Sequence, residues 1–395
     1  MPRFSLLLTL LIITCHGQAR PVAKPAAIIP FHLVKEKYVL VETVVNDQDT
    51  LMFYFDTGAT ASVIDQAAAE TLGITADYER EIDGAGGKTS IKVATNEKLA
   101  LDGVELANQH LVIQDLQSLE KMLEYPLQGI IGRTLMSQYY TELDYEQQQI
   151  KLYDLADSLD VSAYSAHPFR FDRGIPIPQL DVSIELTNGN TYSGPVFFDS
   201  GAGLTLLVNT PFSEENQLAE QAEKVLSKDS QGFSGKSVAQ QMAVKSLTLG
   251  KYSFTDLPIS LASGKGGVSA YEGYLGILGA EVINRFNVLL DYESKTMYLK
   301  PNASFSKPFS FPLSGLSLRE NDEGEIYIHS VSEQSPAYAK GIRAGSVVLA
   351  VNGYSGNDLA TFRKQLKEKG TEVNLELITH DNTRKTYRFR LERLL

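Results

Sequence analysis

Two runs of apolar and aromatic residues end in the same kind of acidic turn. They are residues 52–59 (MFYFDTGA) and residues 196–202 (VFFDSGA). Apolar runs of this length are typical of buried strands, and an Asp, a hydroxyl residue and a Gly at their end are typical of tight turns. The pattern therefore predicts two strands that each present one carboxylate, Asp56 and Asp199, from a rigid base.

The surroundings of the two turns also repeat. An apolar segment with a glycine at each end follows each turn at a similar distance, at 129–132 (GIIG) and at 276–279 (GILG). An Asp-Tyr pair then follows each segment at the same distance, at 144–145 and 291–292. Because these features recur in one order, the sequence predicts an internal repeat, in which one chain holds two copies of a supersecondary unit.

Most of each copy has the pattern of strands, interrupted by short helices. Residues 67–72 predict a helix that ends at Gly73, a C-cap signal, and residues 214–226 predict a longer helix in the second copy. Asn188 and Gly189 lie between apolar stretches and predict a hairpin turn. The fold class is therefore mainly β with short helices.

Each copy also contains a polar, glycine-bearing loop, at 83–87 (DGAGG) and at 229–235 (DSQGFSG). Such loops are either mobile flaps that close over a bound chain or ordinary hairpin tips, and the sequence leaves both open. Both continue into the end of a phosphate-binding motif, but Ile82 and Ser230 occupy the positions of its first glycine, which excludes a nucleotide site. The candidate flap residues are Gly84, Gly86, Gly87, Gly232, Phe233 and Gly235.

The N-terminus has the pattern of a secretory signal peptide. Arg3 precedes the apolar run 4–14, which is too short to span a bilayer, and residues suited to cleavage follow up to Ala19. Cleavage there would remove Cys15, the only cysteine, and leave a mature protein without disulfides. Alternatively, residues 11–15 (LIITC) resemble a lipoprotein box in which Cys15 is lipidated. We expect a periplasmic or extracellular protein, with or without this lipid anchor.

Composition and charge exclude several other functions. The 395 residues have a formal net charge of −12 and no basic stripe, which argues against nucleic acid and anionic membranes as partners. The six histidines lack the spacing of metal ligands, so we expect no metal site and no cofactor. Residues 199–201 (DSG) look like a serine-protease nucleophile, but no histidine lies in a matching context. No transmembrane helix is expected.

The paired motifs resemble the aspartic peptidases, with two lobes of retropepsin size joined in one chain, from about Pro30 to Pro301. The resemblance implies a bilobal aspartic-protease fold of β-barrels in which Asp56 and Asp199 are catalytic and meet between the lobes. Retropepsins dimerise to pair their acids; because one chain holds both acids here, we expect a monomer. The residues that would support the site are Thr57, Gly58, Ser200 and Gly201, and the glycine loops would supply the flaps.

Two carboxylates about 3 Å apart cannot both ionise cheaply, so they share a proton. The ionised one can take a proton from water, and the protonated one can donate to the scissile carbonyl oxygen. The sequence therefore predicts an endopeptidase that acts on peptide or protein substrates without an acyl-enzyme. Two alternatives stay open: the turns merely cap local backbone, or the protein is a catalytically silent peptide-binding module.

The C-terminal part resembles a PDZ domain of the bacterial type. The resemblance lies in residues 314–318 (SGLSL) and 335–353 (SPAYAKGIRAGSVVLAVNG), and it implies an α+β domain that recruits or regulates peptide substrates. Main-chain N–H groups would hold a C-terminal carboxylate while a strand edge accepts the peptide. Leu359, Phe362 and Leu366 share one helical face, which favours core packing. The implied peptide-binding residues are Gly315, Leu316, Ser317 and Leu318.

These observations divide the chain into domains. The predicted units are a signal peptide (1–19), a leader (20–29), lobe 1 (30–155), lobe 2 (156–302), a linker (303–310) and the PDZ domain (311–395).

Overall fold

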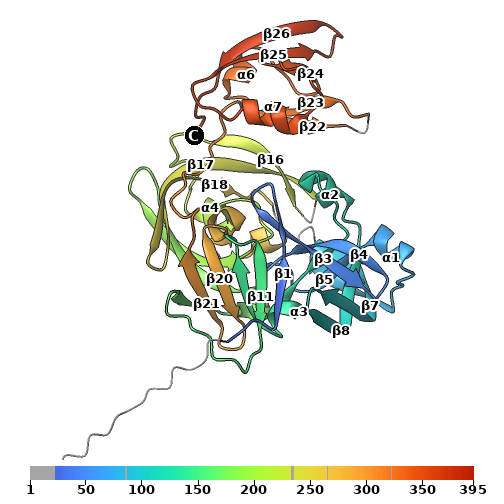
Figure 1. The fold of residues 1–395 in the computed structure, drawn as a ribbon. Helices are drawn as coiled ribbons and strands as arrows, with labels where there is room; N and C mark the ends of the chain where they lie inside the picture. Colours follow the sequence, from blue (N-terminus) through green and yellow to red (C-terminus); the bar gives the residue numbers. More distant parts are fainter. Residues whose placement is uncertain (1–22, 85–86, 233–234, 265, 322) are drawn as a thin grey trace, which may run out of the picture.

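The computed structural model describes residues 23–84, 87–232, 235–264, 266–321 and 323–395, and within them the chain is mainly β (Figure 1). The strands form four sheets, and the longest helices have seven residues. Three sheets build the larger N-terminal part, and the fourth forms a C-terminal domain at the top of Figure 1. The predicted fold class is therefore confirmed. Among these residues, no helix has the length and hydropathy needed to cross a bilayer.

The first half of the chain forms an eight-stranded sheet, the main sheet of lobe 1 (residues 30–155). In order across the sheet, its strands are β2 (His32–Val34), β3 (Tyr38–Val45), β4 (Asp49–Phe55), β9 (Gly129–Ile131), β5 (Ser62–Asp65), β8 (Val104–Gln114), β7 (Gly87–Leu101) and β6 (Tyr78–Gly84). Strand β3 pairs with both β4 and β7, so that the sheet curls back on itself. At its centre, β9 runs parallel to β4 and places Ile131 beside Phe55.

A seven-stranded sheet, the main sheet of lobe 2 (residues 156–302), has the same central arrangement. Its strands in order are β13 (Gln179–Glu185), β14 (Thr191–Phe198), β19 (Gly276–Leu278), β15 (Leu206–Val208), β18 (Tyr252–Leu261), β17 (Gly235–Leu249) and β16 (Leu226–Gly232). Strand β14 runs parallel to β19 and places Phe198 beside Leu278, as β4 does with β9. Strand β13 also pairs with β17, so this sheet curls as well.

A third, six-stranded sheet joins the two halves. Its strands in order are β1 (Ala27–Pro30), β11 (Gln149–Tyr153), β10 (Tyr140–Asp144), β20 (Phe286–Asp291), β21 (Thr296–Pro301) and β12 (Ser165–Pro168). Strand β10 from the first half pairs antiparallel with β20 from the second. The first strand begins at Ala27, inside the segment expected to be a leader, because its main chain pairs with β11.

The helices are short and lie between strands. They are α1 (Gln66–Thr71), α2 (Gln117–Leu123), α3 (Arg133–Met136), α4 (Thr210–Glu215) and α5 (Ala280–Ile283), with 3₁₀ turns at Asp172–Gly174 and Val268–Ala270. As predicted, α1 is followed by Gly73 at φ 68°. Asp65 caps its start by accepting the N–H groups of Ala67 and Ala68. The predicted hairpin at Asn188 joins β13 to β14.

The long helix predicted for residues 214–226 is wrong. The structure instead begins α4 at Thr210, with Pro211 in its first turn, and the chain leaves the helix at Gln217, whose φ is 50°. Leu218 is buried in the core of the two lobes without being helical. After α4, this part of the chain is therefore an irregular segment that leads into β16.

The C-terminal domain has a core of its own. Its sheet follows chain order, and α7 packs against the edge strand β22 and against β24. Leu359, Phe362 and Leu366 are buried in this core, as the shared helical face predicted. The elements are β22 (Leu316–Glu320), β23 (Ile326–Val331), α6 (Pro336–Ala339), β24 (Val347–Val351), α7 (Leu359–Gln365), β25 (Glu372–Ile378) and β26 (Arg384–Arg390).

Candidate active site

Asp56 and Asp199 meet where the ends of β4 and β14 face each other. Their carboxyl groups are in hydrogen-bond contact. The glycines of the two turns make this approach possible, because a Cβ atom on Gly58 would lie 2.5 Å from the carboxyl carbon of Asp199. A Cβ atom on Gly201 would likewise lie 2.5 Å from the carboxyl carbon of Asp56. Each glycine therefore leaves room for the acid of the opposite lobe.

Each carboxylate is also held by its own turn. The N–H of Gly58 donates to Oδ1 of Asp56 at 2.7 Å. In the second turn, the N–H groups of Gly201 and Ala202 donate to Oδ1 of Asp199 at 2.8 and 3.0 Å. Local bonds of this kind are what Asp contributes to turns. They fix one oxygen of each acid and direct the carboxyl group toward the other lobe.

The apolar segment that follows each turn in sequence lies directly beside it. The main-chain N–H of Asp56 donates to the carbonyl of Ile131 on β9 at 3.0 Å. The N–H of Asp199 donates to the carbonyl of Leu278 on β19 at the same distance. A buried parallel strand thus extends each acidic strand up to the acid itself, which explains why the Gly-Ile-Ile and Gly-Ile-Leu runs recur.

Thr57 and Ser200 bind the two turns to each other. The Thr57 hydroxyl donates to the carbonyl of Phe198 at 2.8 Å and accepts the N–H of Ser200 at 2.9 Å. Reciprocally, the Ser200 hydroxyl accepts the N–H of Thr57 at 3.1 Å and lies 3.4 Å from the carbonyl of Phe55. Both side chains are buried. These crossed bonds hold the lobes in register at the acids.

Burial raises the pKa of both carboxyl groups. For Asp199, the negative charge of Asp56 adds to burial and raises the pKa well above its ordinary value. For Asp56, burial raises the pKa, and N–H donors led by Gly58 offset part of that rise. The pair therefore retains a shared proton at a pH at which two isolated aspartates would both be ionised, and it titrates as one unit.

Two family models match the chain. Residues 41–135 match the model of an aspartyl protease, and residues 307–378 match that of a PDZ domain. The chain contains an aspartyl protease domain and a PDZ domain. The aspartyl protease match includes Asp56 and ends before Asp199, so the place of the second acid comes from the geometry described above. No curated protein matches the chain.

One residue next to the acids of the aspartyl protease domain escaped the sequence analysis. The hydroxyl of Tyr54, on β4, crosses to lobe 2 and donates to the carbonyl of Ser200 at 3.1 Å. Tyr54 is buried, and its ring packs edge to face on Tyr38 at 5.7 Å. The signal in the sequence was a tyrosine two residues before the first acid, where the second copy has Phe197.

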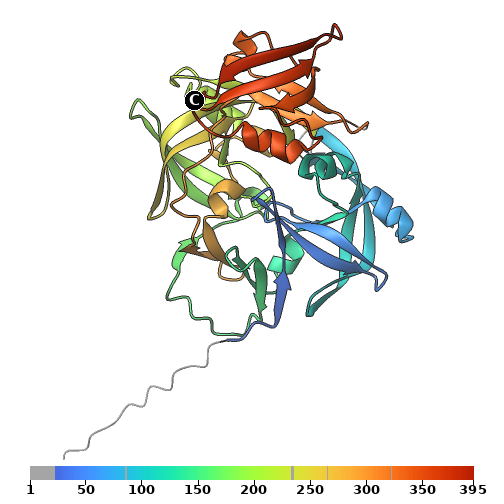
Figure 2. The same cartoon turned by 45° about the horizontal axis from the view of Figure 1, so that its top comes forward.

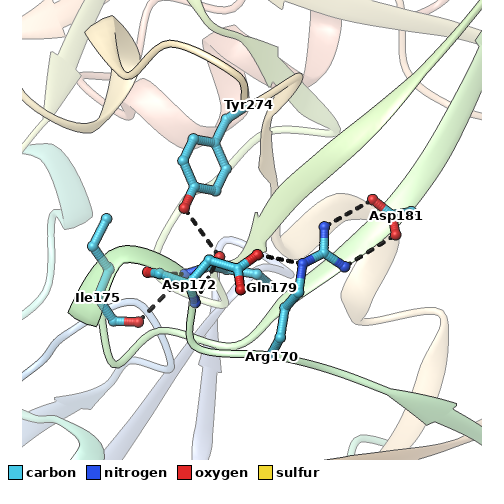
Figure 3. Close-up of polar contacts among 6 residues, drawn as sticks. All are labelled: Arg170, Asp172, Ile175, Gln179, Asp181 and Tyr274. Atoms are coloured by element: carbon cyan, nitrogen blue, oxygen red, sulfur yellow. Dashed lines mark hydrogen bonds and ion pairs between the residues drawn. The ribbon is translucent and has the colours of Figure 1, made fainter.

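Phe197, on the strand that enters the second acidic turn, has a different aromatic partner. It stacks on Tyr274 with ring centroids 4.6 Å apart. The hydroxyl of Tyr274 donates to Oε1 of Gln179 at 3.1 Å (Figure 3). Gln179 is fully buried, and its amide in turn donates to the carbonyl of Ile175 at 3.3 Å. The phenol of lobe 2 therefore bonds within its own lobe rather than across the acids.

The candidate flap residues lie at the ends of two hairpins. Gly84 pairs with Gly87 at the end of β6 and β7, and Gly232 pairs with Gly235 at the end of β16 and β17. The remaining candidates, Gly86 and Phe233, lie outside the described residues. The hairpin arrangement fits both readings of the sequence, flap and ordinary tip.

The expected carboxylate-binding loop of the PDZ domain is shorter than predicted. Leu316, Ser317 and Leu318 lie in strand β22, where they pair with β23, because the chain becomes extended directly after Gly315 at φ 71°. The N–H of Leu316 already donates to the hydroxyl of Ser314 at 3.1 Å. As predicted, β22 is an edge strand.

The PDZ domain contacts both lobes through arginines. Arg363 on α7 donates to Oε2 of Glu124 in lobe 1 at 2.7 Å, and its other terminal nitrogen donates to the carbonyl of Leu318 on β22 at 2.7 Å. Arg393 binds both carboxylate oxygens of Asp256 in lobe 2 at 2.8 and 2.7 Å. Figures 1 and 2 show α7 beside α2, the helix that ends before Glu124.

Proposed function

We propose that this protein is an aspartic endopeptidase that hydrolyses peptide bonds with water activated by Asp56 and Asp199. The observation that carries the proposal is the mutual approach of the two acids, with each carboxyl group seated against the glycine of the opposite turn. If each Asp merely capped its own turn, the residue opposite it in the other turn would not need to lack a side chain. The proposed catalytic unit consists of lobe 1 (residues 30–155) and lobe 2 (residues 156–302).

In the proposed reaction, the two acids act as a general base and a general acid. The ionised carboxylate takes a proton from water, and the resulting hydroxide adds to the scissile carbonyl carbon. The protonated carboxyl group donates its proton to the carbonyl oxygen, which gives a neutral tetrahedral intermediate. Collapse of this intermediate breaks the carbon–nitrogen bond, and the acid that first accepted a proton returns it to the leaving amine. The other acid, now ionised, takes a proton from one hydroxyl of the intermediate, which becomes the carboxylic acid product and restores the shared proton of the pair. Burial of the pair supports this role, because it keeps one proton shared between the acids.

Hydrolysis of an unfolded protein by the mature chain, between acid and neutral pH, tests the proposal. Asp56→Asn and Asp199→Asn serve as controls, because each keeps the size of the side chain and removes its charge. We expect cleavage by the wild-type protein and none by either variant. A catalytically silent peptide-binding module would give the same negligible turnover in all three.

We also propose that the PDZ domain regulates the peptidase through its peptide groove. A peptide added to edge strand β22 needs main-chain acceptors on that strand, and Arg363 already occupies the carbonyl of Leu318. A ligand with a terminal carboxylate would also compete with Glu124 for the same guanidinium. Binding of a peptide in this groove and contact of the PDZ domain with lobe 1 through Arg363 are therefore mutually exclusive in the proposal.

The strength of the contact suits a reversible switch. The side chains of Arg363 and Glu124 are 32% and 40% exposed, so water screens their attraction. Ion pairs with this exposure contribute up to about 1 kcal/mol, which shifts an equilibrium by about fivefold. A peptide ligand can displace a contact of that size.

Finally, we propose that the protein is exported through the N-terminal signal. The two predicted forms of the mature N-terminus differ in mass, because cleavage after Ala19 removes Cys15 and lipidation retains it. Intact-mass measurement of the protein from the cells that export it distinguishes the two. A protein that retains Met1 would contradict both forms.

A further inference from the structure

We propose that Tyr54 is a positioning residue that supports the second acid through the peptide group between Ser200 and Gly201. The inference rests on the proposed peptidase function. It concerns an interaction for which the second copy of the unit has no counterpart, because Phe197 at the matching position carries no hydroxyl.

The geometry forms a continuous chain of hydrogen bonds from Tyr54 to Asp199. The Tyr54 hydroxyl donates to the Ser200 carbonyl at 3.1 Å. The nitrogen at the other end of that same planar peptide group belongs to Gly201, and its N–H donates to Oδ1 of Asp199 at 2.8 Å. A hydrogen bond to a carbonyl polarises the peptide group and makes its N–H a stronger donor. Tyr54 thus strengthens, from lobe 1, the bond that holds the acid of lobe 2.

The first acidic turn has no counterpart of the Tyr54 hydroxyl in lobe 2, although the N–H of Gly201 also lowers the pKa of Asp56. The N–H of Gly58 donates to Asp56 at 2.7 Å, a direct bond of nearly the same length as that from Gly201 to Asp199. The residue equivalent to Tyr54 is Phe197, whose ring stacks on Tyr274. The hydroxyl of Tyr274 donates to Oε1 of Gln179 and so does not reach the acids (Figure 3). Two turns of almost identical sequence therefore have unequal surroundings, and Tyr54 makes the two acids distinct.

Tyr54 remains a donor throughout the working pH range. Burial and the charge of Asp56 raise the pKa of its hydroxyl well above the ordinary value for tyrosine. The other titratable groups that act on it are Tyr38, Asp199 and Tyr145, and Tyr38 in turn faces the carboxylate of Glu281. Arg133 and Asp56 in turn act on the buried Tyr292. Among these groups, Tyr54 is the one whose hydroxyl bonds to the second acidic turn.

Tyr54→Phe tests the proposal, because it keeps the ring and removes the hydroxyl. Loss of one direct donor at a catalytic charge costs about a hundredfold or more in kcat, so we expect about tenfold for this relayed one, with KM changed less than about twofold. A weaker N–H donor raises the pKa of the carboxylate it holds. The acid limb of the rate profile, where the pair takes up its second proton, should therefore move to higher pH.

A matched control separates positioning from general stability. Tyr252 is also buried, and its hydroxyl also donates to a main-chain carbonyl, that of Leu299 at 3.2 Å, away from the acids. Tyr252→Phe should lower the melting temperature about as much as Tyr54→Phe and leave kcat and the pH profile unchanged. The proposal is overturned if both variants change the pH profile equally, or if Tyr54→Phe retains the wild-type kcat and profile.

An NMR measurement separates failure of this inference from failure of the proposed function. In Tyr54→Phe, the amide proton signal of Gly201 should move upfield. The pKa of the Asp199 carboxyl group, followed by the chemical shift of its carboxyl carbon, should rise. Both changes are expected whether or not the protein cleaves peptides. An active wild-type enzyme with both signals unchanged in the variant contradicts the role of Tyr54 alone. An inactive wild-type protein whose signals do shift contradicts the peptidase function and leaves the hydrogen-bond relay established.

Discussion

Replacement of Thr57 by valine removes the centre of the crossed bonds between the lobes. Thr57 is 1% exposed, and valine has nearly the same shape, so the change substitutes a methyl group for the hydroxyl without opening a cavity. The hydroxyl donates to the carbonyl of Phe198 at 2.8 Å and accepts the N–H of Ser200 at 2.9 Å. In the variant, both of these buried groups lose that partner.

The expected cost follows from the two orphaned groups. Each buried polar group left without its partner costs about 1–3 kcal/mol, so Thr57→Val should lower the free energy of unfolding by about 2–6 kcal/mol. Domains are typically stable by about 5–15 kcal/mol, so this is a large fraction. The lobes should also lose register at the acids, and kcat should fall with stability.

Thr43→Val provides a matched control within the same lobe. Thr43 is fully buried, and its hydroxyl has no hydrogen-bond partner among the residues that the structure describes. The same change there strands no other group, so we expect it to be neutral or slightly stabilising.

The assay is urea unfolding followed by circular dichroism, with both variants fitted by linear extrapolation. The difference between the two free energies cancels the contribution of the PDZ domain, which both variants share. Equal stabilities for Thr57→Val and Thr43→Val would refute the reasoning, because the crossed bonds would then contribute nothing to the joining of the lobes.

Three further predictions test other parts of the account. Gly58→Ala should lower kcat/KM at least about a hundredfold with an unchanged circular dichroism spectrum, because the new methyl group would lie 2.5 Å from the carboxyl carbon of Asp199; a fully active variant would show that the acids are not in contact. Because burial raises the folded-state pKa of Asp199, folding stability should fall as pH rises from the ordinary pKa through the raised one. Asp199→Asn should therefore melt at a higher temperature than the wild type at neutral pH, and a lower melting temperature would contradict the assigned shift. Glu124→Gln should tighten binding of a peptide with a free C-terminal carboxylate by up to about fivefold at low salt, measured by calorimetry; an equal gain with the amidated peptide would count against competition for Arg363.

The acids and the strands that carry them could be predicted because their signals are local. Asp56 and Asp199 each end an apolar run and begin a glycine turn, and these features need only a few neighbouring residues. The meeting of the two acids was implied by the resemblance to the aspartic peptidases, which the repeated motifs carry. The resemblance also implied that Thr57 and Ser200 support the site, and in the structure their hydroxyl groups bond across the two turns.

What escaped prediction depends on contacts between distant parts of the chain. The pairing of β10 with β20 joins residues such as Leu143 and Val288, and neither strand carries a local sign of its partner. The bond from Tyr54 to Ser200 likewise crosses between the lobes. The long helix was wrongly predicted because the residue types in 214–226 do not indicate the left-handed backbone at Gln217. This backbone conformation ends α4 early.

The most direct test of the central claim is a double-mutant cycle on the two acids. Steady-state kcat/KM on an unfolded protein substrate is measured for the wild type, Asp56→Asn, Asp199→Asn and the double variant. Because the proposed mechanism has the acids act as one unit on a single water molecule, each single change should remove essentially all of the activity, and the double variant should be no slower than either. Substantial activity in one single variant, or losses that multiply in the double variant, would contradict the account.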